Sequence, residues 1–362
     1  MNAPSRTLLI MAGGTGGHVM PALAVAEHLR SEGWRVVWLG TKAGMEARLA
    51  VEKGFDIAWV KVAGIRGKGL LAKLLLPMNL LVAFWQAARA IFRERPDVAL
   101  GLGGYVAFPG GMMATLLAKP LVIHEQNAIA GLTNKILSHL ADRVLLGLPL
   151  ADGDDALGRK GEWVGNPVRP EIAALPAPAE RLAGREGPLH LLVIGGSLGA
   201  TALNERVPQA LSRIPKEQRP LVRHQSGRKH LDILKGHYAD AGVKAECLDF
   251  IGDMAEAYAW ADVVICRAGA LTVAEIAASG SAALFVPFPF AVDDHQTANA
   301  RFLADAGAAW LKQQTEFTPA FLADWLMNLT GEELLERAEK ARALAKPDAT
   351  ARVAEVVKEL AK

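Results

Sequence analysis

His18 is the first residue whose type and position suggest chemistry. It follows the glycine loop Gly13-Gly14-Thr15-Gly16-Gly17 and stands where a helix is expected to begin. Because a helix N-terminus disfavours the protonated imidazolium, a neutral imidazole able to accept a proton is expected there. The alternative is a histidine that caps the helix or packs under the loop, and position alone does not separate the two.

Glu275 supplies a carboxylate near the start of another expected helix. The strand-like residues 263–266 precede it, and Thr272 and Glu275 have the S/T-x-x-E spacing of a capping box. The pattern alone favours a carboxylate that bonds the backbone at the helix start. The functional alternative is a carboxylate that accepts hydrogen bonds from the hydroxyls of a ribose.

Asp152-Gly153-Asp154 has the D-x-D spacing of some metal sites. It lies in a segment rich in proline and glycine, beside a further aspartate, so we predict no metal site there and no required metal cofactor. The formal charge of +2 gives no reason to propose a nucleic-acid partner.

The elements that would position these residues form two similar halves. Residues 7–12 and 189–194 are apolar runs, and each precedes a glycine loop and a helical pattern. Further apolar runs alternate with helix-length segments, which predicts βαβ units and parallel sheets; these runs are 35–40, 98–102, 121–124, 143–146, 220–224, 245–250, 263–266 and 282–286. We therefore predict an α/β protein of two nucleotide-type domains that face each other across a cleft, with the boundary near Asn166.

The spacing of the two glycine loops excludes two common nucleotide sites. A dinucleotide site requires G-x-G-x-x-G and an acidic residue after the second strand, but residue 19 is valine and that strand ends in Leu39-Gly40-Thr41. The second loop, Gly195-Gly196-Ser197-Leu198-Gly199, does not fit either, and neither loop has the Gly-Lys-Ser/Thr of a P-loop. Tight turns that pack a helix on a sheet remain the alternative for each loop.

Residues 64–93 combine a long apolar run with flanking basic residues. Lys73, Pro77 and Asn79 interrupt the run, so it is not expected to span a bilayer. Apolar side chains with basic neighbours suit an interfacial patch on anionic lipid. The alternative is ordinary helix packing within an α/β domain.

Six motifs occur in order along the chain; they begin at Gly13, His124, Gly165, Gly195, Ala268 and Asp293. Together they resemble those of the bacterial peptidoglycan N-acetylglucosaminyltransferases, GT-B glycosyltransferases of family 28. The resemblance covers the whole chain and implies a GT-B fold with two Rossmann-like domains: residues 1–165 on the acceptor and membrane side, and residues 166–347 on the donor side. It also implies that a final helix, about 348–362, packs back on the first domain.

The resemblance implies a set of binding residues for UDP-N-acetylglucosamine. Leu198 departs from the glutamine common in the family, which puts a side-chain contact at that position in doubt. Asn127 and Gln296 would contact the sugar, and Thr15, Gly16 and Gly17 would lie close to the transferred residue. The uridine diphosphate side would be held by Arg169, Ser197, Ile251, Ala270, Leu271, Thr272, Val273, Ala274 and Glu275.

The implied reaction transfers N-acetylglucosamine to the C4 hydroxyl of the muramyl sugar of lipid I, with inversion and without a covalent intermediate. His18 is the expected base, with Glu125 as its rival. Gly104 and Tyr105 are assigned to the acceptor's diphosphate, although a plain loop is a close alternative. The implied location is peripheral, on the cytoplasmic face of the inner membrane, where residues 64–93 would contact anionic lipid and proteins of cell-wall synthesis are candidate partners.

Three other functions use comparable architecture. A nucleotide-sugar 2-epimerase would convert the donor alone, and a non-catalytic nucleotide-sugar-binding protein would bind it without turnover. A nicotinamide dehydrogenase is disfavoured by the failed fingerprint.

Overall fold

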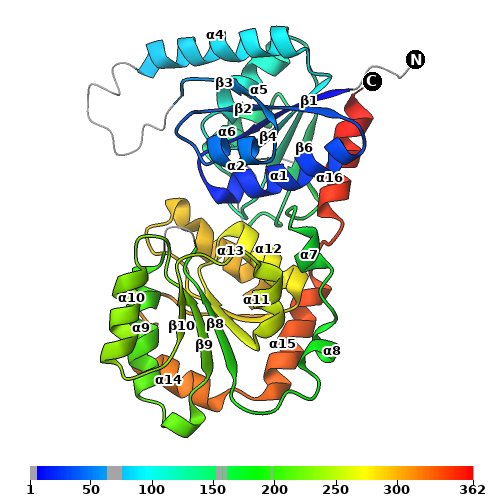
Figure 1. Cartoon of the computed structure of the whole chain (residues 1–362). Coiled ribbons are helices and arrows are strands. Elements are labelled where there is room, and N and C mark those ends of the chain that lie inside the picture. Colours follow the sequence, from blue (N-terminus) through cyan, green and yellow to red (C-terminus); the bar gives the residue numbers. More distant parts are fainter. Residues whose placement is uncertain (1–5, 63–75, 152–156, 158–160, 197–198, 362) are drawn as a thin grey trace. The chain divides into compact units, whose positions relative to one another are not determined.

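The computed structural model describes residues 6–62, 76–151, 157, 161–196 and 199–361. The chain divides into two compact units, each built on one parallel sheet (Figure 1). Unit 1 comprises residues 1–168 and 346–362, and unit 2 comprises residues 169–345. These breaks lie beside the domain limits predicted at residues 165 and 347. Two such units have the architecture of the GT-B class.

Unit 1 alternates strands and helices along its length. Its sheet has the order β3-β2-β1-β4-β5-β6-β7, with every neighbouring pair parallel. Its elements are β1 (Thr7–Ala12), α1 (Gly16–Ser31), β2 (Arg35–Gly40), α2 (Glu46–Glu52), β3 (Asp56–Trp59), α4 (Leu76–Glu94), β4 (Val98–Gly103), α5 (Ala107–Leu116), β5 (Leu121–Glu125), α6 (Leu132–Leu137), β6 (Arg143–Leu146), β7 (Gly161–Trp163) and, at the end of the chain, α16 (Ala349–Leu360).

Unit 2 repeats this plan with the strand order β10-β9-β8-β11-β12-β13, again all parallel. Two short 3-10 turns, Lys216–Gln218 and Val292–Asp294, interrupt its loops. Its elements are α7 (Pro170–Ala173), α8 (Pro178–Leu182), β8 (His190–Ile194), α9 (Thr201–Ser212), β9 (Leu221–Gln225), α10 (Leu231–Asp240), β10 (Glu246–Leu248), α11 (Met254–Trp260), β11 (Val263–Cys266), α12 (Ala270–Ser279), β12 (Ala282–Phe285), α13 (His295–Ala304), β13 (Trp310–Leu311), α14 (Pro319–Asn328) and α15 (Gly331–Ala343).

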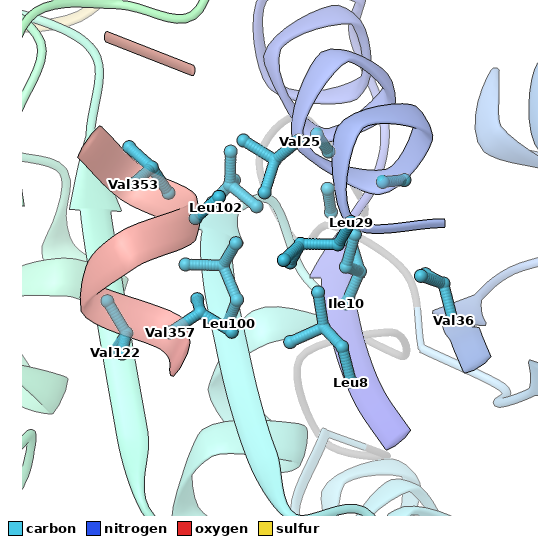
Figure 2. Close-up of a cluster of buried hydrophobic side chains, with 14 of the residues drawn as sticks. Leu8, Ile10, Val25, Leu29, Val36, Leu100, Leu102, Val122, Val353 and Val357 are labelled. Carbon is cyan, nitrogen blue, oxygen red and sulfur yellow. The ribbon is translucent and has the colours of Figure 1, made fainter. Parts of the chain in front are cut away.

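The central strands are buried on both faces, which is why they read as continuous apolar runs. Leu8 and Ile10 of β1 join one cluster with α1 and α16, whereas Leu9 and Met11 join the cluster on the other face. Figure 2 shows Val353 and Val357 of α16 directed at the β4 side chains of the first cluster. The last helix is therefore part of the core of unit 1.

The helix α4 presents large apolar side chains to solvent and small ones to the protein. Trp85 and Leu81 are 61% and 69% exposed, and Met78 and Phe92 lie on the same face. The buried face consists of Ala83, Ala87, Ala90 and Ile91. No helix in the described part of the chain combines the length and apolar content needed to cross a bilayer.

Both sheets have the same topological switch point. In unit 1 the strand that follows β1 in sequence, β2, pairs with one edge of β1, and β4 pairs with the other edge. In unit 2, β9 and β11 flank β8 in the same way. Ligands of open α/β sheets bind outside the carboxyl ends of the strands at such a point. The loops after β1, β4, β8 and β11 are therefore the places to look for a site.

Candidate functional site

The first glycine loop connects β1 to α1 at the switch point of unit 1. Gly14 has a φ of +90°, a conformation that glycine adopts without strain. Thr15 is the N-cap residue of α1, so Gly16 and Gly17 supply the first backbone N–H groups of the helix. Those groups precede the intrahelical ladder and can bind an electron-rich ligand.

His18 is the third residue of α1, as the sequence predicts. Its Nδ1 lies 3.3 Å from the hydroxyl oxygen of Thr15. The other edge of the ring lies against the backbone of Gly103, where a Cβ atom would come within 2.8 Å of Cδ2 and 2.9 Å of Nε2. A glycine at position 103 is therefore required for this placement of the imidazole.

Gly104 brings the loop after β4 onto the first glycine loop. Its φ is +82°, and a Cβ atom there would lie 2.3 Å from the carbonyl oxygen of Gly13. The neighbouring Tyr105 is 53% exposed. The predicted acceptor residues Gly104 and Tyr105 thus lie beside the loop that carries His18, a proximity that the sequence did not indicate.

Glu125 occupies the end of β5 and is only 2% exposed. One carboxylate oxygen accepts hydrogen bonds from the backbone N and the Nδ2 of Asn127, at 3.0 and 3.1 Å. The other accepts from Gly131 N at 3.0 Å and Asn134 Nδ2 at 2.8 Å. A carboxylate with four such donors is engaged in holding its loop, which favours a structural role for Glu125 over that of a base.

His124 fixes the end of β5 to the Gly165-Asn166-Pro167 segment. Its Nε2 lies 3.0 Å from the carbonyl oxygen of Gly165, and Gln126 Nε2 donates to its Nδ1 at 3.1 Å. Burial lowers the pKa of His124. Asn166 adds a hydrogen bond from its Nδ2 to the carbonyl oxygen of Gln126. This motif therefore joins two segments of unit 1 through neutral groups.

Glu46 is a buried residue whose position gave no signal in the sequence. Its carboxylate accepts hydrogen bonds from Gly14 N at 3.0 Å and from Thr41 N and Oγ1 at 2.9 Å each. The group lies behind the first glycine loop and is fully buried. No motif marks it, because two of its three partners are backbone amides.

In unit 2, α12 begins at the switch point with Gly269 as its N-cap residue. The capping box expected from Thr272 and Glu275 is therefore wrong, because the helix starts two residues before Thr272. Val273 N already donates to the carbonyl oxygen of Gly269 at 2.9 Å, and Ala274 follows it in the helix. The N–H groups that precede this ladder belong to Ala270, Leu271 and Thr272. They lie at the carboxyl end of β11, where an anionic ligand would gain from them.

Glu275 is directed at side chains rather than at the helix start. Arg169 Nη2 donates to its Oε1 at 2.9 Å, and the hydroxyl of Tyr258 donates to its Oε2 at 3.1 Å. Burial and the neighbouring carboxylate raise the pKa of Tyr258 well above its ordinary value. The two predicted donor residues Arg169 and Glu275 are thus brought together, and Tyr258 is a partner that the sequence did not reveal.

Gln296 is the second residue of α13 and ties that helix to the start of α12. Its Oε1 accepts hydrogen bonds from Phe288 N at 3.0 Å and from Ala268 N at 3.3 Å. The predicted Gln296 contact to a sugar would therefore use the side-chain nitrogen, because the side-chain oxygen already accepts two hydrogen bonds.

Ile251, another predicted donor residue, is buried in the loop between β10 and α11.

The second glycine loop is supported by a buried network of neutral groups. Gly199 has a φ of +81°, and a Cβ atom there would lie 2.3 Å from the carbonyl oxygen of Ser226. Asn204 Nδ2 donates to that same oxygen at 3.1 Å, and Asn204 Oδ1 lies 3.1 Å from His224 Nε2. The hydroxyl of Tyr238 lies 2.9 Å from His224 Nδ1.

These contacts define the protonation of His224. Because Asn204 directs its oxygen at Nε2, that nitrogen carries the proton, and Nδ1 accepts from Tyr238. Burial lowers the pKa of His224 to about 3. The imidazole is therefore neutral over the ordinary pH range.

Some predicted residues lie outside the described ranges. These are Ser197 and Leu198 of the second loop, Asp152 to Asp154, and residues 64–75 of the predicted interfacial segment. Among the residues that the structure describes, no group of three or more His, Cys, Asp or Glu side chains is arranged to hold a metal ion.

The comparisons with known proteins agree along the whole chain. The glycosyltransferase family 28 N-terminal domain matches residues 8–146, and the glycosyltransferase family 28 C-terminal domain matches residues 190–360. A relative from Dechloromonas aromatica is 59% identical over 358 residues, which cover 99% of this chain and 100% of that protein. Its name is UDP-N-acetylglucosamine–N-acetylmuramyl-(pentapeptide) pyrophosphoryl-undecaprenol N-acetylglucosamine transferase.

Solved structures give the same picture. The crystal structure of Acinetobacter baumannii MurG has a TM-score of 0.82 and 42% identity, with 98% of this chain and 100% of that chain covered. A putative UDP-N-acetylglucosamine 2-epimerase from Listeria monocytogenes has a TM-score of 0.64 but only 12% identity, over 97% of this chain and 95% of that chain. The second likeness is one of fold alone.

Proposed function

Because the chain belongs to glycosyltransferase family 28, we infer that it transfers N-acetylglucosamine from UDP-N-acetylglucosamine to N-acetylmuramyl-(pentapeptide) pyrophosphoryl-undecaprenol. The reaction converts lipid I to lipid II in peptidoglycan synthesis. The observation that carries this conclusion is the 59% identity to a transferase of that name over 99% of the chain. The protein is an enzyme, an N-acetylglucosaminyltransferase.

We propose that unit 2 binds the donor at the start of α12. The backbone N–H groups of Ala270, Leu271 and Thr272 suit a diphosphate, and Glu275 suits a ribose diol because it retains lone pairs beyond those that Arg169 and Tyr258 use. Gln296 would donate from its amide nitrogen to a sugar oxygen. Ile251, Val273, Ala274 and Ser197 complete the proposed donor site.

We propose that His18 of unit 1 is the base. The acceptor C4 oxygen attacks the anomeric carbon as its proton passes to His18, and the bond from that carbon to the diphosphate breaks with its electron pair leaving on UDP. One direct displacement inverts the α-linkage of the donor to β. Thr15, Gly16 and Gly17 would lie near the transferred sugar, with Asn127 as a further contact and Gly104 and Tyr105 near the acceptor's diphosphate.

In this proposal the departing charge is stabilised by helix N-termini and Arg169, with no resident metal. Glu125 holds the loop that leads from β5 to α6 rather than taking the proton, because its carboxylate accepts four hydrogen bonds from Asn127, Gly131 and Asn134. His18 is left as the base among the two candidates.

We propose further that the exposed face of α4 rests on an anionic membrane surface. That face carries Leu81, Trp85 and Phe92, and Arg89 lies 5.7 Å from the centre of the Trp85 ring. An amphipathic helix of this composition binds the interface rather than spanning it. The enzyme would thus act peripherally on the cytoplasmic face of the inner membrane, where its acceptor is anchored and where cell-wall synthesis proteins are candidate partners.

The function is tested by incubating UDP-N-acetylglucosamine with the enzyme, with and without a soluble lipid I analogue. A transferase releases UDP only when acceptor is present and forms the disaccharide product. Conversion of the donor alone would instead indicate an epimerase, and binding without turnover would indicate a non-catalytic protein.

The role of His18 is tested with a substitution. His18→Ala is expected to bind UDP-N-acetylglucosamine normally but to lose turnover; undiminished turnover would show that His18 is not the base.

The membrane contact is tested by liposome sedimentation with anionic vesicles. Trp85→Glu together with Leu81→Glu is expected to abolish sedimentation, while Ile233→Glu, an equally exposed position on unit 2, leaves it unchanged. Retained binding of the double variant with its fold intact would contradict the proposal.

A further inference from the structure

We propose that Glu46 is a positioning residue for the transfer reaction: its buried carboxylate holds the first glycine loop in the conformation that places His18. The proposal rests on the function proposed above, since it assigns Glu46 a task in that reaction. Glu46 touches no substrate; it acts through the loop.

The first observation is the set of hydrogen bonds. Glu46 joins the loop after β1 to the end of β2, because Oε2 accepts from Gly14 N while Oε1 accepts from both donors of Thr41. Hydrogen bonds to an ionised acceptor are stronger than those between neutral groups. Full burial excludes the water that would otherwise compete for these donors.

The second observation is that glycines surround the carboxylate. A Cβ atom on Gly13 would lie 2.9 Å from Oε1, one on Gly40 would lie 2.9 Å from Cγ, and one on Gly44 would lie 2.0 Å from Oε2. Only bare backbone fits this closely, so the chain around Glu46 is shaped to admit one carboxylate.

The third observation links this pocket to His18. The carbonyl oxygen of Gly13 would lie 2.3 Å from a Cβ atom on Gly104, and the His18 ring packs on the preceding residue, Gly103. Glu46, the loop and the imidazole are therefore in consecutive contact. A shift of Gly13 and Gly14 would move both the start of α1 and the surface against which the ring packs.

The same contacts determine which loop amides face a substrate. Because the N–H of Gly14 is directed at Glu46, it is turned away from a ligand, whereas the N–H groups of Gly16 and Gly17 lie at the start of α1. A glutamine at position 46 would set its NH2 group against either Gly14 N or Thr41 N, both of which are donors. Glu46→Gln therefore changes the loop while preserving the shape of the side chain.

The experiment compares Glu46→Gln with Asp97→Asn in the full-length enzyme. Asp97 is a matched control, because it accepts from Thr7 N at 2.7 Å at the opposite end of the same strand, β1. We expect kcat with a soluble lipid I analogue to fall about 10- to 100-fold in Glu46→Gln, with the dissociation constant for UDP unchanged. Asp97→Asn should lower the melting temperature less, because Asp97 is only part-buried and the Oδ1 of asparagine can still accept from Thr7 N, and it should leave kcat unchanged.

Amide hydrogen exchange gives a readout that does not depend on activity. The exchange of Gly14 N–H should accelerate in Glu46→Gln and not in Asp97→Asn. If kcat stays within twofold of the parent while the melting temperature falls, Glu46 is only structural and the proposal is overturned.

Two further arms keep the result interpretable. If Glu46→Gln does not fold, Thr41→Val removes one of the three hydrogen bonds and should lower kcat several-fold; an unchanged kcat there also overturns the proposal. Failure of the proposed function would appear in the parent enzyme as absent transfer, which is distinct from any effect of Glu46.

Discussion

The glycine loop after β1 and the glycine loop after β8 occupy the same topological position, yet different groups hold them. In unit 1 the carboxylate of Glu46 fixes the loop by accepting a hydrogen bond from the backbone N–H of Gly14. In unit 2 it is a neutral chain from Tyr238 through His224 and Asn204 to the carbonyl oxygen of Ser226, against which Gly199 packs.

The two loops need different partners because different groups lie at their buried sides. The first loop directs an N–H group inward and so requires an acceptor, and a charged acceptor gives the strongest bond. The second loop packs against a carbonyl oxygen, which requires a donor behind it. In the proposed reaction the second unit binds the diphosphate, so a neutral support also avoids placing a negative charge behind an anion.

The largest expected effects come from the two glycines that lie closest to other backbone. Gly104→Ala and Gly199→Ala each place Cβ 2.3 Å from a carbonyl oxygen at a positive φ. Each should reduce the free energy of unfolding by about 3 kcal/mol. If the units divide the work as proposed, Gly104→Ala lowers kcat about 100-fold, whereas Gly199→Ala chiefly weakens UDP binding.

Urea denaturation, initial rates and UDP titration measure these outcomes. Gly33→Ala is the control, since its φ is +87° but nothing lies within 4 Å of the added Cβ. Gly33→Ala should reduce the free energy of unfolding by about 1 kcal/mol and leave kcat and UDP binding unchanged. Equal effects of Gly104→Ala and Gly199→Ala on kcat and UDP binding would break the comparison.

The next effect is the pH dependence of the free energy of unfolding, which tests the neutral network around His224 in unit 2. The pKa of His224 is lowered to about 3 in the folded protein, against an ordinary value of 6.5. As the pH falls below 6.5, the unfolded chain binds a proton that the folded chain does not, so the free energy of unfolding falls. Between pH 7 and pH 5 the loss from this residue should be about 2 kcal/mol.

Urea unfolding at a series of pH values checks this expectation. His224→Gln removes the titrating group. Between pH 6 and pH 4 the slope of the free energy of unfolding against pH should therefore fall by the amount that corresponds to about one bound proton. His124 retains its own lowered pKa in that variant, so part of the acid sensitivity persists. A parallel pH dependence in the parent and His224→Gln would contradict the assignment.

The smallest effect distinguishes two buried tyrosines of unit 2. Tyr258→Phe removes a donor from Glu275 and should raise the KM for UDP-N-acetylglucosamine about tenfold, because a hydrogen bond to a charged group is worth about 1.5 kcal/mol. Tyr238→Phe removes a donor from His224 and should lower stability with little change in that KM. Steady-state kinetics and thermal denaturation of the two variants give the comparison, and identical KM changes would contradict it.

The sequence predicts the central strands because burial on both faces leaves uninterrupted apolar runs. The strands β3, β7 and β13 were not predicted, and all three are edge strands with partly exposed residues, the last only two residues long. Their pairing depends on a neighbouring strand already being in place. The family and the reaction were recognisable because six motifs keep their order.

Site details were less predictable where partners are distant in sequence or belong to the backbone. The capping interpretation of Thr272 and Glu275 failed because Gly269 begins the helix, and local spacing carries no information about Arg169 or Tyr258. Glu46 gave no signal for the related reason that backbone amides have no sequence identity. The surroundings of Glu125 were equally hard to predict, because two of its four donors are the backbone amides of Asn127 and Gly131.

The position of α16 has a consequence for synthesis on the ribosome. Unit 2 is one uninterrupted stretch, residues 169–345, whereas unit 1 is formed by two stretches that unit 2 separates along the chain. The first 168 residues of unit 1 are therefore made before Val353, Val356 and Val357, and the whole of unit 2 is made in between. During that interval α1 can already pack on this face of the sheet, but Leu100 and Leu102 lack the cover of α16, so the nascent first unit exposes an apolar stripe.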